Sequence, residues 1–446
     1  DWRVALFTLA LSLLTGAVFG VLPLARVNRM NLSNELREGS RGASDGRSGK
    51  RGRTLLVITE MALAVLLVIS AGLTIRSFVN LLQIDPGFNA RGVLTMRVSL
   101  PNATYQDPTS VENFYHQLGE QVRALPGVQA AGFGRLLPLA SEMGDAGLAV
   151  ESHPVPAGVP GYQADWQAVS PGYFEAMQMK LVAGRFIDAT DTRDGLQTIV
   201  INQTLAKEYF PGENPLGQRI RVGGQDRPWR VVVGIVGDYH HNGLTAPFKR
   251  AFFVPADQWV NSYGQPRRAM TLIVRTSADP QGLIAPISDI SRRLAPDVPM
   301  TQVTTMGAVL SAATQEQRFT MALMAGFALL ALILAAVGIY GVLSYSVSQR
   351  TREIGIRLAL GAEVRSVRAL VLRQGIAPAL VGIGLGVVAA LLLTRFLGSM
   401  LYGVAPVDAV TFLTIPLLLL AVAAGSVLVP AVRASRVEPV EALRGE

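Results

Sequence analysis

TMALMAGFALLALILAAVGIYGVLSYSV, residues 320–347, runs for 28 residues without a charged side chain. A transmembrane helix needs about 20 consecutive apolar residues to cross the hydrocarbon layer of a bilayer. The stretch therefore predicts a membrane-spanning helix. The composition of the whole chain agrees, because 50% of its residues are hydrophobic and 16% are charged, whereas an ordinary soluble domain has about 25% charged residues.

Four further apolar runs are long enough to cross a membrane, at residues 4–25, 54–75, 375–394 and 409–432. The first run has no basic leader and is longer than the core of a secretory signal, so it predicts a true span. Glu60 is the one charged residue in the five runs. Because an ionised carboxylate facing lipid is costly, we expect Glu60 to face the helix bundle. There it pairs with a polar neighbour, reaches toward the interface, or relays protons.

The positive charges collect in two short segments. Residues 26–53 hold eight Lys/Arg against three Asp/Glu, and residues 348–373 hold six Arg against two Glu. Cytoplasmic loops carry an excess of Lys and Arg, so both segments are expected inside the cell. Residues 77–318 carry 20 basic and 21 acidic residues. The net charge of +8 therefore belongs to the short loops and does not indicate nucleic-acid binding.

Alternation of the spans across the membrane then divides the chain into ten segments. They are a transmembrane helix from a preceding unit (1–25), a cytoplasmic basic linker (26–53), a transmembrane helix with a stalk (54–76), a periplasmic domain (77–318), a transmembrane helix (319–347), a cytoplasmic coupling-helix loop (348–373), a transmembrane helix (374–394), a short periplasmic loop (395–408), a transmembrane helix (409–432) and a cytoplasmic tail (433–446).

An internal repeat relates the first span to the last. At an offset of 407 residues Pro23 matches Pro430 and Arg26 matches Arg433. Four further identities at the same offset pair Asp1, Arg29, Leu36 and Arg37 with Asp408, Arg436, Leu443 and Arg444. Residues 1–25 therefore look like the last span of a preceding unit in a duplicated protein, and 54–446 look like one complete unit.

The periplasmic domain has the pattern of alternating strands and helices. A β-α-β order occurs at 93–100, 108–125 and 128–134, and it returns at 270–276, 280–294 and 299–304. Two such units predict a ferredoxin-like subdomain. Residues 138–266, between them, contain several short β-rich runs and predict an inserted, mostly-β subdomain. We expect residues 305–318 to continue into the next span as one helix of about 40 residues. The fold class is thus an α-helical membrane protein with five spans and an α+β periplasmic domain.

Five motifs make the chain resemble a known family. They are Val-Ser-Pro-Gly-Tyr-Phe-Glu-Ala-Met at 169–177, Ala-Lys-Glu-Tyr-Phe-Pro-Gly-Glu-Asn-Pro-Leu-Gly-Gln-Arg-Ile at 206–220, Val-Gly-Ile-Val-Gly-Asp at 233–238, Ala-Val-Gly-Ile-Tyr-Gly-Val-Leu-Ser-Tyr at 336–345, and Gln-Arg-Thr-Arg-Glu-Ile-Gly-Ile-Arg-Leu-Ala-Leu-Gly-Ala at 349–362. With these motifs the chain resembles ABC transporter permeases of the MacB/FtsX type, in particular the duplicated acidobacterial permeases.

The resemblance implies a multi-pass permease of the bacterial inner membrane whose cytoplasmic helix contacts a separate ABC ATPase subunit, which binds the ATP. It also implies a second permease unit, as a homodimer or as a pseudo-dimer within a longer chain, and a periplasmic adaptor as a further partner. The lipid membrane is the remaining partner. No cofactor or metal is expected in this chain itself.

The Arg-rich loop supports the coupling role from its own residues. Glu353 precedes Arg357 by four positions, Ile354 and Leu358 form an apolar stripe, and Gly361 can end the helix. The expected ATPase-coupling residues are Arg350, Arg352, Glu353, Ile354, Ile356, Arg357, Leu358 and Gly361. The alternative interpretation is an amphipathic helix that lies on the membrane surface.

Other motifs favour structural interpretations. The sequence has no P-loop, so we do not expect this chain to be an ATPase. Gly382, Gly384 and Gly386 lie inside a span, where small residues permit close helix packing. His240 and His241 have no acidic cluster near them in sequence, which favours a surface turn over a metal site. Without a recognisable catalytic arrangement, we do not expect an enzyme.

Two functional classes remain open. The first is export by mechanotransmission, in which ATP binding by the partner closes the cytoplasmic ends of the spans and moves the periplasmic domain. The second is an FtsX-like regulator that switches a periplasmic partner such as a cell-wall hydrolase. A receptor would need a cytoplasmic catalytic domain, which this sequence lacks.

Overall fold

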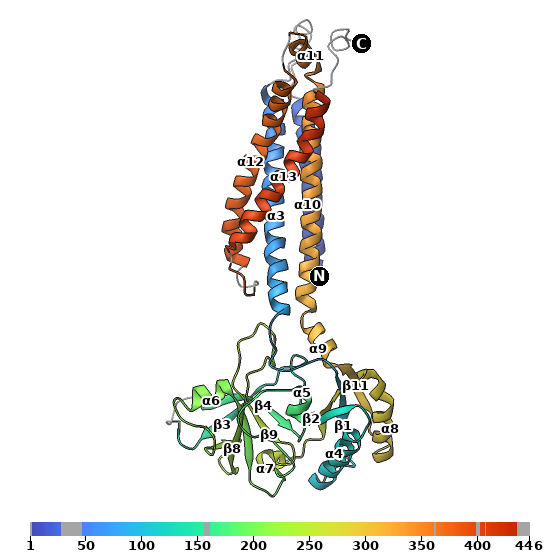
Figure 1. The fold of residues 1–446 in the computed structure, drawn as a ribbon, viewed down its shortest axis with the longest axis vertical. Helices are drawn as coiled ribbons and strands as arrows, with labels where there is room; N and C mark the ends of the chain where they lie inside the picture. The colour runs from blue at the N-terminus through green and yellow to red at the C-terminus, as the bar shows by residue number, and fades with distance from the viewer. Residues whose placement is uncertain are drawn as a thin grey trace. The chain divides into compact units, whose positions relative to one another are not determined.

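The protein divides into two compact units, which we describe separately. The computed structural model describes residues 2–27, 47–155, 161–360, 363–397, 402–405 and 407–434. Unit 1 comprises residues 1–63, 334–385 and 420–446, and unit 2 comprises residues 64–333 and 386–419. Figure 1 labels helices and strands of both units and colours them by position along the chain.

The chain contains several long apolar helices. They are α1 (Trp2–Val27), α3 (Arg47–Leu82), α10 (Gln315–Ser348), α12 (Val364–Leu397) and α13 (Ala409–Ala434). Among the described residues, four stretches are long and apolar enough to cross a membrane: Arg51–Leu82, Gln315–Ser348, Arg365–Arg395 and Ala409–Ala434. These correspond to four of the five expected spans. In α1 the apolar stretch is Ala5–Ala17, so the span expected at 4–25 stays a prediction.

Glycine permits close helix packing in unit 1. A Cβ atom at Gly382 of α12 would lie 2.6 Å from the carbonyl oxygen of Ile58 in α3. Such a contact requires glycine, and it brings the two backbones together. Gly384 has no atom within 4 Å of its Cβ position. The packing interpretation therefore fits Gly382 and not Gly384.

Unit 2 contains the periplasmic domain, which is built on one 11-stranded sheet. Its strands are β1 (Val93–Ser99), β2 (Val128–Gly134), β3 (Asp145–Val150), β4 (Tyr162–Val169), β5 (Leu181–Gly184), β6 (Thr198–Asn202), β7 (Arg219–Val222), β8 (Trp229–Val236), β9 (Ala251–Pro255), β10 (Ala269–Thr276) and β11 (Met300–Thr305). The helical segments are α4 (Pro108–Arg123), α5 (Tyr173–Met177), α6 (Gln203–Tyr209), α7 (Trp259–Tyr263), the 3-10 turn η1 (Pro280–Leu283), α8 (Ile284–Leu294) and α9 (Met306–Ala313).

The first part of the sheet consists of β11, β1, β10 and β2, in that order and antiparallel throughout. Helices α4 and α8 contact each other on one face, as Figure 1 shows, and α5 packs against β2 and β10. Strand alternation separates two cores: Leu94 and Leu272 pack with α4 and α8, whereas Val93 and Ile273 pack with α5. Both faces of these strands are therefore buried.

The segment between β2 and β10 folds as a closed barrel. The sheet continues from β4 through β3, β7, β8 and β6 to β9, and β9 pairs with β4 in parallel. This last pairing closes the ring of strands and leaves no free edge among them. Ile199 and Ile201 belong to the core cluster that also includes Leu205 and Tyr209 of α6, whereas Val200 joins the core under α5.

The connection to α10 differs from our expectation. The single helix of about 40 residues predicted from position 305 onward is wrong, because α9 ends at Ala313 and α10 begins at Gln315. Thr305 starts α9 by accepting a hydrogen bond from the Ala308 N–H at 3.2 Å. The break lies at the buried Thr314, whose hydroxyl donates to the Ser311 carbonyl at 3.1 Å. Such side-chain bonds to the backbone compete with helix continuation.

Candidate functional site

The Arg-rich loop between α10 and α12 contains the short helix α11 (Thr351–Ala359). Thr351 starts it directly after α10, because its hydroxyl donates to the carbonyls of Val347 at 3.2 Å and Ser348 at 3.0 Å. The Ile354 N–H then donates to the Arg350 carbonyl at 2.9 Å. The turn between the two helices is therefore short and held by hydrogen bonds.

Ile354 attaches α11 to the rest of unit 1. Its side chain is 5% exposed and packs with Val367 and Val371 of α12 and with Ala431 and Ala434 of α13. Burying an isoleucine side chain contributes about 1.5–3 kcal/mol. Ile354 thus joins α11 to the adjacent ends of α12 and α13.

The outer face of α11 combines an ion pair with apolar side chains. Glu353 and Arg357 pair at 2.7 Å, and both are about half exposed. Exposed pairs of this spacing contribute only about 0.3–0.5 kcal/mol to stability. Ile356 is 42% exposed and Leu360 is 82% exposed. We did not predict Leu360 as a site residue, although its position four residues after Ile356 was a signal.

A groove of about 170 Å³ lies beside α11. Leu343, Val347 and Val371 supply apolar wall, and Arg350 and Ser366 are among its polar residues. The structure therefore brings Arg350, Glu353, Ile354 and Arg357 around one groove. The side chains of Arg352 and Leu358, and the whole of Gly361, lie outside the described residues, so the Ile354–Leu358 stripe and the Gly361 cap stay predictions.

Glu60 of α3 lies against Gly338 of α10. A Cβ atom at position 338 would be 2.0 Å from the Glu60 Oε2 atom, so the glycine leaves room for the carboxylate. Within the described part of the chain, no hydrogen bond or ion pair of Glu60 is formed. The polar neighbour that we expected for Glu60 is therefore absent from those residues.

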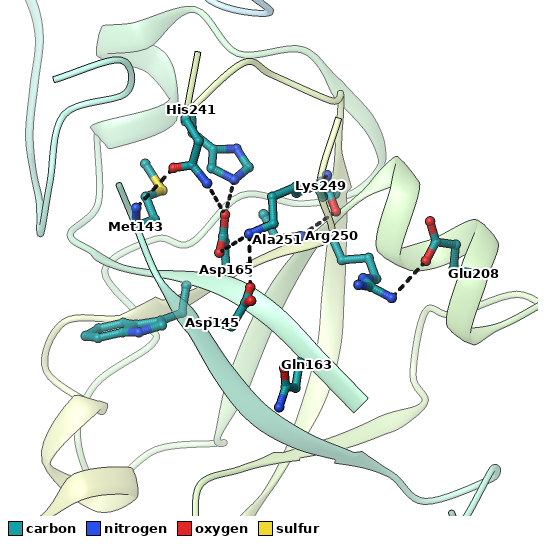
Figure 2. Close-up of polar contacts among 12 residues, drawn as sticks. Met143, Asp145, Gln163, Asp165, Glu208, His241, Lys249, Arg250 and Ala251 are labelled. Carbon is teal, nitrogen blue, oxygen red and sulfur yellow. Dashed lines mark hydrogen bonds and ion pairs between the residues drawn. The ribbon is translucent and has the colours of Figure 1, made fainter. Parts of the chain in front are cut away.

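The prediction that His240 and His241 occupy a surface turn is wrong. His240 is 8% exposed and His241 is 2% exposed, and His241 Nε2 contacts a carboxylate oxygen of Asp165. Figure 2 shows Asp165 facing both His241 and Lys249, whose Nζ lies 3.1 Å from Asp165 Oδ1. Asp165 precedes His241 by 76 residues, so this acidic partner is distant in sequence.

The Asp165 cluster is a structural charge cluster. Burial alone would raise the pKa of Asp165, but the hydrogen bonds from His241 and Lys249 outweigh it and hold that pKa below its ordinary value. Asp165 has no exposed side-chain surface, so a substrate cannot reach it. No group of three or more potential metal ligands occurs among the residues that the structure describes.

Comparisons with known proteins identify both parts of the chain. Residues 54–290 match the MacB-like periplasmic core domain, and residues 325–439 match the FtsX-like permease C-terminal domain. The macrolide export ATP-binding/permease protein MacB of Rhodospirillum rubrum is 28% identical over 249 residues. That alignment covers 53% of this chain and 37% of the relative, so the chain matches well under half of that protein.

Another relative and one solved structure are also similar to this chain. The uncharacterized ABC transporter permease YknZ of Bacillus subtilis is 26% identical over 288 residues, which cover 62% of this chain and 69% of that protein. The crystal structure of the periplasmic region of MacB from Actinobacillus actinomycetemcomitans aligns with 52% of this chain and 97% of its own, at 14% identity and a TM-score of 0.35.

Proposed function

Because this chain belongs to the ABC transporter permeases of the MacB/FtsX type, we propose that it couples ATP hydrolysis by a separate ATPase subunit to a conformational change of its periplasmic domain. The change drives export by mechanotransmission, without passage of the substrate between the spans. The 446-residue sequence contains no P-loop, so in this proposal the ATP is bound by the partner.

The observation that carries the proposal is the attachment of α11. Ile354 is buried against α12 and α13, while Ile356 and the Glu353–Arg357 pair remain accessible. A helix that only rested on lipid would turn its apolar residues toward the membrane and would need no such anchor. An anchored helix with an accessible mixed face can receive a partner and transmit its movement.

The proposal includes the finer organisation of the chain. It has five spans, with the Arg-rich segments in the cytoplasm and the protein in the bacterial inner membrane. The periplasmic domain combines a ferredoxin-like subdomain with an inserted barrel, which the strand order β11-β1-β10-β2 and the closure of β9 onto β4 support. A second permease unit and a periplasmic adaptor complete the assembly.

Export is favoured over regulation of a cell-wall hydrolase by the type of periplasmic domain. The matched region, residues 54–290, is of the MacB-like core type. The similar protein of Rhodospirillum rubrum is named for macrolide export. We assign no substrate to this chain on that basis.

A charge swap tests the coupling role. In the double variant Glu353→Arg/Arg357→Glu, the i,i+4 pair and the net charge are both kept, but the pattern that a partner meets is inverted. Attraction to anionic lipid depends on the summed charge and should not change. Docking on a complementary groove places like charges in contact, which costs several kcal/mol.

The measurement is affinity purification of the full-length protein from its native membrane, with identification of the co-purified ATPase and assay of its stimulated ATP hydrolysis. We expect the swap to abolish both recovery and stimulation at equal expression. The matched control is Asp289→Arg/Arg292→Asp on α8, an exposed pair in the periplasmic domain, which should change neither. Normal recovery of the ATPase with the α11 swap would refute the site, and a co-purified hydrolase would favour the regulator.

A further inference from the structure

The periplasmic domain contains a cleft that the proposed coupling mechanism does not use. It lies between α4 and the segments around β9 and β10, with a volume of about 330 Å³. Val111, Tyr115, Phe133 and Met270 form an apolar floor, and each is at most 6% exposed. A cleft of this size with an apolar floor and a few polar groups has the character of a small-molecule site.

Most of the carboxylates that line the cleft have partners of their own. Asp257 pairs with His116 at 2.7 Å, Glu112 with Arg193 at 3.3 Å, and Asp191 with Arg185 at 2.7 Å. Asp188 also contacts Arg185, at 3.3 Å, and Glu120 lies on the exposed face of α4. Four of these carboxylates are therefore already engaged by a partner, and Glu120 is exposed to solvent.

Arg267 is different, because it lines the cleft without an acceptor. Across the described ranges it makes no hydrogen bond or ion pair, and its Nε atom is buried without a partner. Its guanidinium group lies 5.3 Å from the ring centre of Trp166 and 5.4 Å from that of Trp259. Contacts with a ring at this distance engage no N–H group of Arg267 in a hydrogen bond, so those donors remain available to a ligand.

A second guanidinium, that of Arg97, lies near Arg267. Burial, and then the nearby Arg97, lower the pKa of Arg267. An anion placed at its edge would therefore remove an unfavourable interaction as well as add hydrogen bonds. A carboxylate matches the two parallel N–H groups of a guanidinium, and these bonds are among the strongest in proteins.

We propose that this cleft binds a small organic acid, with its carboxylate on Arg267 and its apolar body on the floor formed by Val111, Tyr115, Phe133 and Met270. The ligand is a periplasmic substrate or effector of the permease. This inference does not depend on α11, so either proposal can fail without the other.

The test uses full-length protein in lipid nanodiscs and three probes of similar size: 3-phenylpropanoate, 3-phenylpropylamine and 3-phenylpropanol. Calorimetric titration measures each, with empty nanodiscs subtracted to remove partition into lipid. We expect 3-phenylpropanoate to bind saturably and at least tenfold more tightly than the amine or the alcohol, because a charge-assisted hydrogen bond is lost in both.

Two variants and one control locate the binding. Arg267→Gln removes the charge and should weaken 3-phenylpropanoate binding at least tenfold. Ala189→Phe should fill part of the cleft, which Ala189 lines, and leaves Arg267 itself unchanged. Arg292→Gln removes an exposed cation on α8 and should leave affinity within twofold. Thermal unfolding of each variant shows whether the domain is intact.

Three outcomes overturn the proposal: no saturable binding of 3-phenylpropanoate to the wild type, equal or tighter binding of the amine, or unchanged affinity in Ala189→Phe. If Arg267→Gln fails to fold, the probe series and Ala189→Phe still decide the matter.

Discussion

Replacing Asp165 by asparagine should destabilise the periplasmic domain strongly. The carboxylate of Asp165 accepts hydrogen bonds from His241, from the Asn242 amide at 2.8 Å and from Lys249 at 3.1 Å. Asparagine keeps the shape but offers one acceptor oxygen instead of two and turns an NH₂ group toward donors. At least one of the buried donors is then left without an acceptor, and the negative charge opposite Lys249 disappears.

The structure supplies both the magnitude and a matched control. Asp165 is fully buried, and removal of one partner from a buried charge cluster costs about 3–5 kcal/mol. Asp145 contacts the same Lys249 at 3.2 Å, but its side chain is 45% exposed. Asp145→Asn should therefore cost under about 1 kcal/mol. The same substitution beside the same lysine thus has two outcomes, because Asp165 is buried and accepts from three side chains while Asp145 is half exposed.

Tryptophan fluorescence can follow this domain within the full-length protein. Trp166, Trp229 and Trp259 lie in the periplasmic domain, and Trp2 is the fourth tryptophan of the sequence. In a Trp2→Phe background all of the signal therefore reports on that domain. For a domain of this size, a loss of about 3 kcal/mol lowers Tm by about 6–12 °C.

Thermal unfolding in detergent should then show Asp145→Asn within about 3 °C of the parent and Asp165→Asn well below it. Equal shifts for the two variants, or a shift of less than about 3 °C for Asp165→Asn, would refute the view that buried charge pairing holds the barrel together.

Three further predictions concern the same protein. The pKa of Asp165 is lowered on folding, so the contribution of its carboxylate to stability is complete above the pKa of the unfolded state, near 4, and is lost as pH falls toward the pKa of the folded state. The difference in Tm between wild type and Asp165→Asn should therefore narrow between about pH 5 and pH 3. A difference that stays constant over this range would contradict the prediction. Gly338→Leu should lower the thermal stability of the purified protein because it collides with Glu60, and Glu60→Ala should restore part of the loss; no rescue would mean that the two do not compete for space. Asp408→Ala should lower the free energy of unfolding by about 1–2 kcal/mol, because Asp408 starts α13 by accepting a hydrogen bond from the Thr411 N–H at 2.9 Å and also pairs with Arg76 at 2.5 Å. Arg76→Gln removes the ion pair alone and should lower it by less than half as much in the same unfolding assay.

The local sequence determined the long apolar helices and the two β-α-β segments. A run such as 320–347 has no charged residue to be desolvated, and the apolar spacing of 108–125 matches one turn of a helix, so each element follows from its own residues. Arg350, Glu353, Ile354 and Arg357 could be chosen as candidates for the same reason, since their spacing along one helix is known before any tertiary contact.

The tertiary structure decided what depends on residues far apart in the chain. The return of β9 to β4 closes the barrel, and Asp165 meets His241 across 76 residues. No periodicity encodes such a pairing, which is why two buried histidines were taken for a surface turn. The difference in burial between two isoleucines of α11 also depends on distant residues. Ile354 is buried because α12 and α13 cover it, while Ile356, two residues later, is exposed. The position of Arg267 has the same origin, because only the fold decides that its buried Nε atom lacks an acceptor among the described residues, whereas Arg97 and Arg275 bond to carbonyl oxygens.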